Sequence, residues 1–201
     1  PGLTIATLPA DLTVATSSPR RKAQLLQLRP DWHVIEIRGN VPTRLEKLAI
    51  DPKIDATVLA HAGLRRLNFE ISKDGILYGD AVPENTCATI IETGEMLPCV
   101  GQGAVGIEIR ENDGRLAMLC QRLNHFNTQV CTMSERAFLS AMGGGCQSPV
   151  AAYAEVRREK IKMHGLSFGD GSQFSRATVD GKLNEAQELG QALAKQVKAS
   201  L

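Results

Sequence analysis

Short apolar runs alternate with amphipathic stretches along the first third of the chain. Three runs contain β-branched residues and have the length of buried strands: 12–16, 33–37 and 55–60. Each run is followed by a stretch in which apolar residues have helical spacing: 19–28, 45–49 and 61–67. Ser18 suits the N-cap of the first helix, and Pro19 suits its first position. This alternation predicts a parallel sheet with helices on its faces.

The remainder of the chain has a different pattern. Residues 68–95 have weak periodicity and several glycines, which indicates a long surface excursion with at most one short helix. Beyond it, apolar spacing predicts a strand at 105–110, helices at 116–123 and 133–142, three antiparallel strands at 151–157, 160–168 and 174–179, and a last helix over 183–197. From about residue 125 the chain is therefore predicted to form a small α+β domain.

Composition narrows the class of protein. The 201 residues carry a formal net charge of +1, which gives no sign of a nucleic-acid partner. The sequence contains no run of ~18 apolar residues, so no membrane-spanning helix is expected. The first residues lack the basic start and apolar core of a signal peptide, and the cysteines are odd in number, so reduced thiols in the cytoplasm are expected. The chain does not begin with methionine, and we expect a fragment or a processed chain.

Positive charge is concentrated near the beginning of the chain. Residues 11–68 hold ten lysines and arginines against six acids, which favours an anionic partner for this part. The carboxyl ends of parallel strands meet at one edge of a sheet, where ligands bind in open α/β folds. Five arginines stand in or just after the turns that follow the predicted strands: Arg20, Arg21, Arg38, Arg44 and Arg65.

Arg20 and Arg21 are informative because they fall in the first turn of a predicted helix. Cations there oppose the helix dipole, at a cost of a few tenths to ~1 kcal/mol each. Backbone N–H groups, the positive helix end and guanidinium forks together form a site for carboxylate or phosphate. A single arginine is more often a solvated surface charge, but three such turns at one edge favour an anion site. Arg29 and Arg66 lack this placement and are interpreted as structural.

One cysteine stands on a glycine-rich turn. Gly143, Gly144 and Gly145 precede Cys146 between a predicted helix and a predicted strand. The glycines allow close approach of backbone or ligand. The residues alone leave two interpretations open: a helix C-cap with a buried thiol, or a covalent anchor or nucleophile.

Two further motifs match known sites only in part. Residues 101–106 fit the pattern G-x-G-x-x-G, but the dinucleotide fingerprint needs a helix after the turn, and a strand is predicted there. We interpret this stretch as a glycine-rich crossing between domains. Cys120, His125 and Cys131 fit no common zinc spacing, so no metal site is expected.

Longer motifs resemble the porphobilinogen deaminase family, also called hydroxymethylbilane synthases. In chain order they are TSSPRRKAQLL, IRGNVPTRLEKL, DATVLAHAGLRRL, LPCVGQGAVGIEIR and SERAFLSAMGGGCQSPVAAYAEV, followed by the last amphipathic helix. The resemblance covers residues 8–198. It implies a transferase of tetrapyrrole biosynthesis, the route to porphyrins and haem. Such an enzyme joins four porphobilinogen units head to tail, releasing ammonia, on a covalently attached dipyrromethane cofactor.

The resemblance also implies which residues hold that cofactor. The cofactor cysteine matches Cys146, and the arginines that bind acetate and propionate side chains match the five arginines of the predicted edge. Thr16 and Ser18 match positions that contact the cofactor. Many guanidinium groups suit a pyrrole chain that carries two carboxylates on each ring.

Three domains are implied by the same resemblance, and this chain would hold the second and third. Residues 1–99 would form the second domain, an α/β domain like those of periplasmic binding proteins, and residues 121–201 the third. Residues 100–120 would cross back to a first domain, which also carries the catalytic aspartate. No acid of this chain matches that aspartate, so the chain alone is expected to be inactive. The whole enzyme is expected to be a cytoplasmic monomer acting on porphobilinogen and the growing pyrrole chain.

A non-catalytic binding module for small anions is the alternative, because periplasmic binding proteins share this α/β domain type. Cys146 discriminates between the two functions, since a binding module needs no covalent thiol. A dinucleotide oxidoreductase has weaker support from the sequence.

Overall fold

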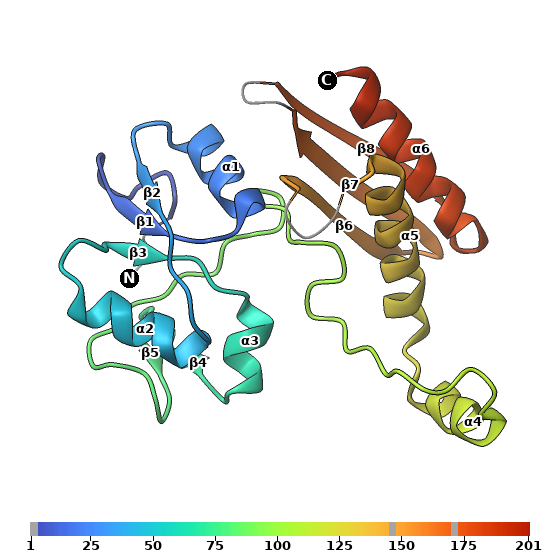
Figure 1. Cartoon of the computed structure of the whole chain (residues 1–201), viewed down its shortest axis with the longest axis horizontal. Coiled ribbons are helices and arrows are strands. Elements are labelled where there is room, and N and C mark those ends of the chain that lie inside the picture. The colour runs from blue at the N-terminus through green and yellow to red at the C-terminus, as the bar shows by residue number, and fades with distance from the viewer. Residues whose placement is uncertain (1–3, 145–147, 170–172) are drawn as a thin grey trace. The chain divides into compact units, whose positions relative to one another are not determined.

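The computed structural model describes residues 4–144, 148–169 and 173–201 (Figure 1). Contacts between residues divide these into two compact units. Unit 1 comprises residues 4–96 together with Ser148 and Pro149, and unit 2 comprises the described residues of 97–144 and 150–201. Each unit has its own hydrophobic core.

Unit 1 is built on a three-stranded parallel sheet. Its strands are β1 (Thr13–Ala15), β2 (His33–Ile35) and β3 (Ala56–Thr57), in the order β2-β1-β3. Val14 of β1 pairs with Val34 on one side and with Ala56 on the other. The predicted parallel sheet is confirmed, although each strand is shorter than its apolar run.

Helices cover both faces of this sheet. α1 (Pro19–Leu28) places Leu25 in one cluster with Val14, while α2 (Val41–Ile50) places Leu48 in another cluster with Ala15. Successive residues of a strand point to opposite faces, so the two helices lie on opposite sides of the sheet, as Figure 1 shows. α3 (His61–Arg66) follows β3 after three residues.

Residues 68–95 fold back onto unit 1. A two-stranded antiparallel hairpin, β4 (Glu70–Ile71) with β5 (Leu77–Tyr78), stands where the sequence left room for one short helix. Phe69 and Leu77 are buried with Leu45 of α2 and Leu64 of α3 in a small cluster of their own. The excursion is therefore held by apolar contacts with α2 and α3.

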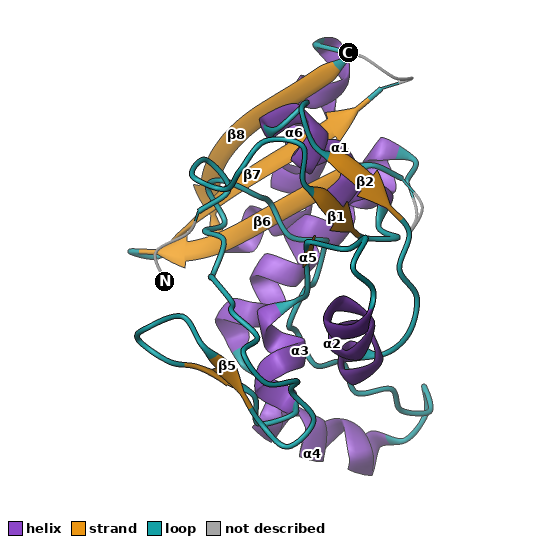
Figure 2. Cartoon of the chain, turned by 90° about the vertical axis from the view of Figure 1, so that its left-hand side faces the viewer, coloured by secondary structure: helices purple, strands orange, loops and turns teal. Residues whose placement is uncertain are grey.

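Unit 2 packs helices against an antiparallel sheet. β6 (Val150–Arg157), β7 (Lys160–Phe168) and β8 (Phe174–Lys182) run side by side in that order. α5 (Phe126–Met142) and α6 (Ala186–Ala199), the latter preceded by the 3-10 turn η1 (Leu183–Glu185), cover one face of the sheet (Figure 2). The predicted α+β fold is confirmed.

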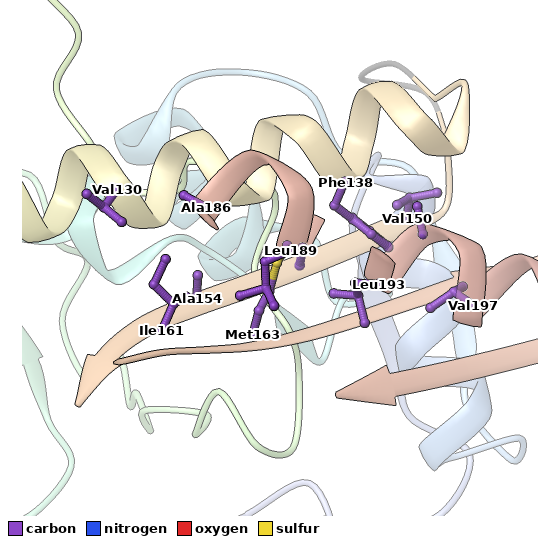
Figure 3. Packing of buried hydrophobic residues seen from close by; sticks show 12 residues of the cluster. Val130, Phe138, Val150, Ala154, Ile161, Met163, Ala186, Leu189, Leu193 and Val197 are labelled. Atoms are coloured by element: carbon purple, nitrogen blue, oxygen red, sulfur yellow. The ribbon is translucent and has the colours of Figure 1, made fainter. Parts of the chain in front are cut away.

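The core of unit 2 is formed by side chains from α5, from α6 and from the sheet. Phe138 of α5, Leu193 of α6 and Met163 of β7 have no exposed surface and meet between the helices and the sheet (Figure 3). The backbones of the two helices lie close together at Gly190. A Cβ there would overlap the carbonyl oxygen of Ser134 and lie 2.8 Å from the backbone nitrogen of Phe138.

The stretch between the two cores differs from its sequence prediction. The strand expected at 105–110 is wrong: these residues form a loop in which Val105 is 92% exposed and Ile107 is 56% exposed. Alternating apolar residues are typical of a strand, but a strand also needs a partner, and none of the described strands pairs with them. The helix expected at 116–123 is confirmed as α4 (Gly114–Leu123), none of whose residues is buried.

Arg29 anchors the residues ahead of β1. Its Nη1 donates to the carbonyl oxygens of Ile5 and Leu8 at 2.8 and 2.9 Å. The guanidinium also forms a 2.6 Å ion pair with Asp31 and lies 4.6 Å from the ring centroid of Trp32. The hydrogen bond from Arg29 holds the pKa of Asp31 below its usual range. Arg29 therefore has a structural role.

Gly190→Ala is expected to lower the free energy of unfolding by about 1–3 kcal/mol or more, because the added methyl group meets backbone atoms that cannot rotate away. Denaturant unfolding followed by circular dichroism measures this change. Gly114→Ala is the control, since a Cβ at Gly114 meets no atom within 4 Å, and its stability should be unchanged or slightly higher. Equal effects of the two substitutions would contradict the close helix contact.

Arg29→Leu is expected to lower the melting temperature and to expose the backbone of residues 4–9 to hydrogen exchange. The folded pKa of Asp31 lies below its ordinary value of 3.8 because of Arg29. The ionised Asp31 carboxylate therefore stabilises the fold above pH 3.8, and this stabilisation is lost as the pH falls through the folded pKa of Asp31. The difference between wild type and variant should accordingly shrink in strong acid. Arg66→Leu, at an exposed arginine of α3, should change neither quantity.

Candidate functional site

The parallel pairing places the carboxyl ends of β1, β2 and β3 at one edge of the sheet of unit 1. The residues that leave the strands there are 16–18, 36–40 and 58–60, and we call these three turns the carboxyl edge. Their common position agrees with the strand–helix alternation of the sequence.

Ser17 joins two turns of the carboxyl edge. Its Oγ donates to the carbonyl oxygen of Ile37 at 2.7 Å and accepts from the Ile37 N–H at 3.1 Å. This reciprocal pair fixes the turn after β1 against the turn after β2. Sequence analysis did not single out Ser17, and the only signal it carried was its place beside the helix-capping Ser18.

Arg21 joins the first turn to the third. Its Nη1 donates to the carbonyl oxygen of Val58 at 2.8 Å, while its backbone N–H donates to Oγ of Ser18 at 3.4 Å. Ser18 is thus the N-cap of α1, as predicted. Together with Ser17, these contacts bind all three turns of the carboxyl edge to one another.

The start of α1 is positively charged. Its first turn contains no acidic residue, and Arg20 is only 6% exposed. Thr16, which is 3% exposed, accepts a 3.3 Å hydrogen bond from the Ser18 N–H on its Oγ1. A buried guanidinium beside the positive end of a helix makes this part of the edge favourable for an anion.

The turn after β2 carries further cations. Arg38 lies in this turn, and its side chain is 83% exposed. Its Nη2 is 3.4 Å from Oε2 of Glu36, whose side chain is also exposed. An exposed pair of this kind is weak, so Arg38 can readily exchange Glu36 for another carboxylate. On α2, Nε of Arg44 donates to the Gly39 carbonyl oxygen at 2.8 Å, and Nζ of Lys47 donates to the Arg38 carbonyl oxygen at 2.9 Å. Lys47 was missed by the sequence analysis, although it lies three residues after Arg44 on the same helical face.

Arg65 is less closely integrated than the other four arginines. It lies in the last turn of α3, with an exposed side chain. Since α3 starts at His61, Arg65 stands about 6 Å along the helix axis from the first residue of α3. The contacts that bind the three turns together do not include it.

Cys146 lies outside the described residues, as does Gly145 before it. The helix preceding them ends as predicted: Gly143 has a left-handed φ of 72°, and the Gly144 N–H donates to the Leu139 carbonyl oxygen at 3.2 Å. This is the backbone pattern of a helix C-cap. The role of the thiol stays a prediction.

The weaker sequence motifs have ordinary structural environments. His125 forms the N-cap of α5, where its Nδ1 lies 2.7 Å from Oγ1 of Thr128, and for this reason α5 begins at Phe126, seven residues before the predicted start. Nowhere in the described ranges do three His, Cys, Asp or Glu side chains gather as a metal site would require. Residues 101–106 lead into a loop rather than a helix. None of the helices in the described part of the chain combines the length and apolar character that a membrane crossing requires.

Comparison with known proteins gives two consecutive family matches. The model of the porphobilinogen deaminase, dipyromethane cofactor binding domain matches residues 1–118, and that of the porphobilinogen deaminase C-terminal domain matches residues 129–199. The first match contains the whole carboxyl edge.

Curated relatives are similar along nearly all of the chain. A porphobilinogen deaminase of Moorella thermoacetica is 42% identical over 199 residues, which cover 98% of this chain and 59% of the relative. One of Thermus thermophilus is 42% identical over 94% of this chain and 59% of its own length, and one of Nitrobacter winogradskyi is 38% identical over 95% and 56%. The chain thus spans somewhat more than half the length of these relatives. From its two matched domains and this level of identity, the chain belongs to the porphobilinogen deaminase family.

Proposed function

We propose that this chain provides the cofactor- and carboxylate-binding part of a hydroxymethylbilane synthase, which polymerises four porphobilinogen units with release of ammonia. One observation carries the proposal. Three strand ends are tied together by Ser17 and Arg21, and arginines cluster on them without a single acid in the first turn of α1. A chain of pyrroles with acetate and propionate groups presents the carboxylates that such an edge would hold.

The donors of the carboxyl edge fit a dipyrromethane. Arg20, Arg21, Arg38 and Arg44 stand on or beside turns that hydrogen bonds fix, and Arg65 would add an exposed guanidinium from α3. Thr16 and Ser18 supply the hydroxyl groups at the start of α1. When bound, the cofactor supplies the nucleophilic pyrrole carbon to which each new unit is added.

Cys146 is proposed as the covalent anchor of the cofactor. It comes directly after three consecutive glycines, the first of which is the C-cap of α5, and glycines permit close approach of a ligand. A thiol also has the nucleophilicity to displace ammonia from an aminomethyl pyrrole and so form a stable thioether. No such thiol is needed by the alternative function, a non-catalytic module that binds small anions.

The catalytic carboxylate is proposed to lie in a part of the enzyme outside this chain. Guanidinium groups repel the cationic states of the reaction, so a carboxylate must be present near them. We assign residues 1–99 and 121–201 to two domains of the enzyme, and residues 100–120 to a segment that contacts a further domain. Exposed apolar side chains on that segment, such as Val105 and Met118, are suited to such a contact. The complete enzyme is proposed to be a cytoplasmic monomer.

Arg38→Leu, made in a full-length enzyme containing this chain, is expected to slow porphobilinogen consumption at least tenfold. A charged hydrogen-bonded contact contributes roughly 1.5–3 kcal/mol, and each 1.4 kcal/mol corresponds to a factor of ten. Arg66→Leu is the matched control, because both side chains are exposed and neither substitution should alter the melting temperature. Equal rates for the two variants would refute a carboxylate site at the edge.

The isolated 201-residue chain is expected not to produce hydroxymethylbilane, whereas a full-length enzyme containing it should. Intact mass and peptide mapping of that enzyme should place a dipyrromethane adduct on Cys146, and Cys146→Ala should lack both the adduct and the activity. Turnover by the isolated chain, freed of host enzyme, would show that the catalytic acid lies within it. An adduct on Cys87, Cys99, Cys120 or Cys131 would overturn the assignment of the anchor.

A further inference from the structure

A buried carboxylate in unit 2 has no place in the function proposed above. Glu135 lies on α5 and is 6% exposed. Both of its oxygens accept backbone hydrogen bonds: Oε2 from the Gly101 N–H at 2.7 Å and Oε1 from the Ala154 N–H at 2.8 Å. One side chain thereby connects α5, the strand β6 and the loop at Gly101.

The contact with Ala154 protects a sheet edge. β6 is an outer strand of the order β6-β7-β8, so among the strands that the structure describes none pairs with its other side. Glu135 accepts a hydrogen bond from this strand and covers it with a helix side chain. Such covering satisfies a backbone donor that would otherwise attract another chain.

The contact with Gly101 marks the end of a docked segment. Leu97 is 1% exposed and packs with Ala151 and Leu166, and Val100 packs against the main core of unit 2. After Gly101, which has a left-handed φ of 69°, residues 102–108 are all exposed. The chain is thus held against unit 2 up to Gly101, and the residues that follow Gly101 are exposed.

We propose that Glu135 is a positioning residue, whose carboxylate fastens Gly101 to α5 and to the edge of β6 and so fixes the point at which the exposed stretch 102–108 begins. Only a carboxylate performs this task at this site, because both side-chain oxygens must accept at once. A glutamine offers one acceptor, and its amide N–H₂ would face one of the two backbone donors. An aspartate is one methylene group too short to reach both.

Burial disfavours the ionised form of Glu135. Burial raises the pKa of Glu135, and the hydrogen bonds from Gly101 and Ala154 only partly oppose the shift. A carboxyl group with a raised folded pKa stabilises the fold most when protonated, and this contribution is lost as the pH rises through the folded pKa. Above that folded pKa the ionised form of Glu135 stabilises the fold less than the protonated form does, and the two backbone hydrogen bonds offset part of this cost.

The same surroundings also disfavour negative charge on the groups beside Glu135. On α5, burial and the charges of Glu135 and Glu155 raise the pKa of Cys131 to about 11. Tyr153 of β6 also has a raised pKa, chiefly from burial. Glu155, on the same strand, forms an ion pair with Arg157 at 2.8 Å, so the guanidinium of Arg157 already has a carboxylate partner.

The test follows the two backbone amides by NMR in the 201-residue chain. In Glu135→Gln one side-chain acceptor is lost, so the Gly101 amide should exchange with solvent at least tenfold faster, while the amides of β7, which lies between β6 and β8, keep their protection. Glu188→Gln is the matched control, because it removes the same charge from an exposed glutamate of α6 and should change none of these rates. Unchanged protection of Gly101 in Glu135→Gln, or loss at Ala154 alone, would overturn the proposal.

A titration of the unaltered chain gives an independent readout that needs no variant. The amide proton shifts of Gly101 and Ala154 should move together through one common midpoint, which lies above the ordinary glutamate value of 4.5 because the pKa of Glu135 is raised. Separate midpoints, or no movement of the Gly101 amide, would show that the carboxylate does not hold both donors. Neither experiment depends on the activity proposed for the enzyme, so the two proposals can fail separately.

Discussion

The central position of β1 is the constraint on which unit 1 depends. This strand has only three residues, yet it pairs with β2 and β3 on its two sides and buries Val14 and Ala15 on its two faces. Because both pairings are parallel, the chain must return each time through a helix, and every helix begins near the same edge. The carboxyl edge, with its arginines, is a direct consequence of that topology.

Short strands alone would hold such an edge loosely. Side-chain hydrogen bonds to the backbone replace the missing strand length: Ser17 bonds to Ile37, Arg21 to Val58, and Thr57 donates to the Ala15 carbonyl oxygen at 2.9 Å. Arg21 thus has two roles, since it is both a cation of the proposed carboxylate site and a fastening between turns. The local unfavourable placement of cations at the start of α1 is tolerated because these tertiary contacts fix the helix in place.

Unit 2 achieves its order by different means. Its strands are long, their register is continuous over nine residue pairs between β7 and β8, and close packing at Gly165 and Gly190 lets the helices approach the sheet and each other. Glu135 stands at the border of this well-packed region, where the docked segment ends and the exposed apolar stretch begins. Unit 2 thus combines a closely packed core with an exposed apolar segment that begins directly after Gly101.

The sequence by itself determined the order and type of most elements, because apolar periodicity and the caps at Ser18 and Gly143 are local signals. It also determined the family, through long contiguous motifs, and it predicted arginines at the carboxyl edge, of which Arg65 lies farther along α3 than the other four lie from their turns. Only the tertiary structure decided that residues 105–110 remain a loop, since alternation of apolar residues cannot supply a partner strand. It alone also revealed Ser17, Lys47 and Glu135, whose partners Ile37, Arg38, Gly101 and Ala154 lie 9 to 34 residues away in the chain. A hydrogen bond across such a separation leaves no periodic trace in the sequence, because it depends on how the elements pack and not on the order of residues within any one of them.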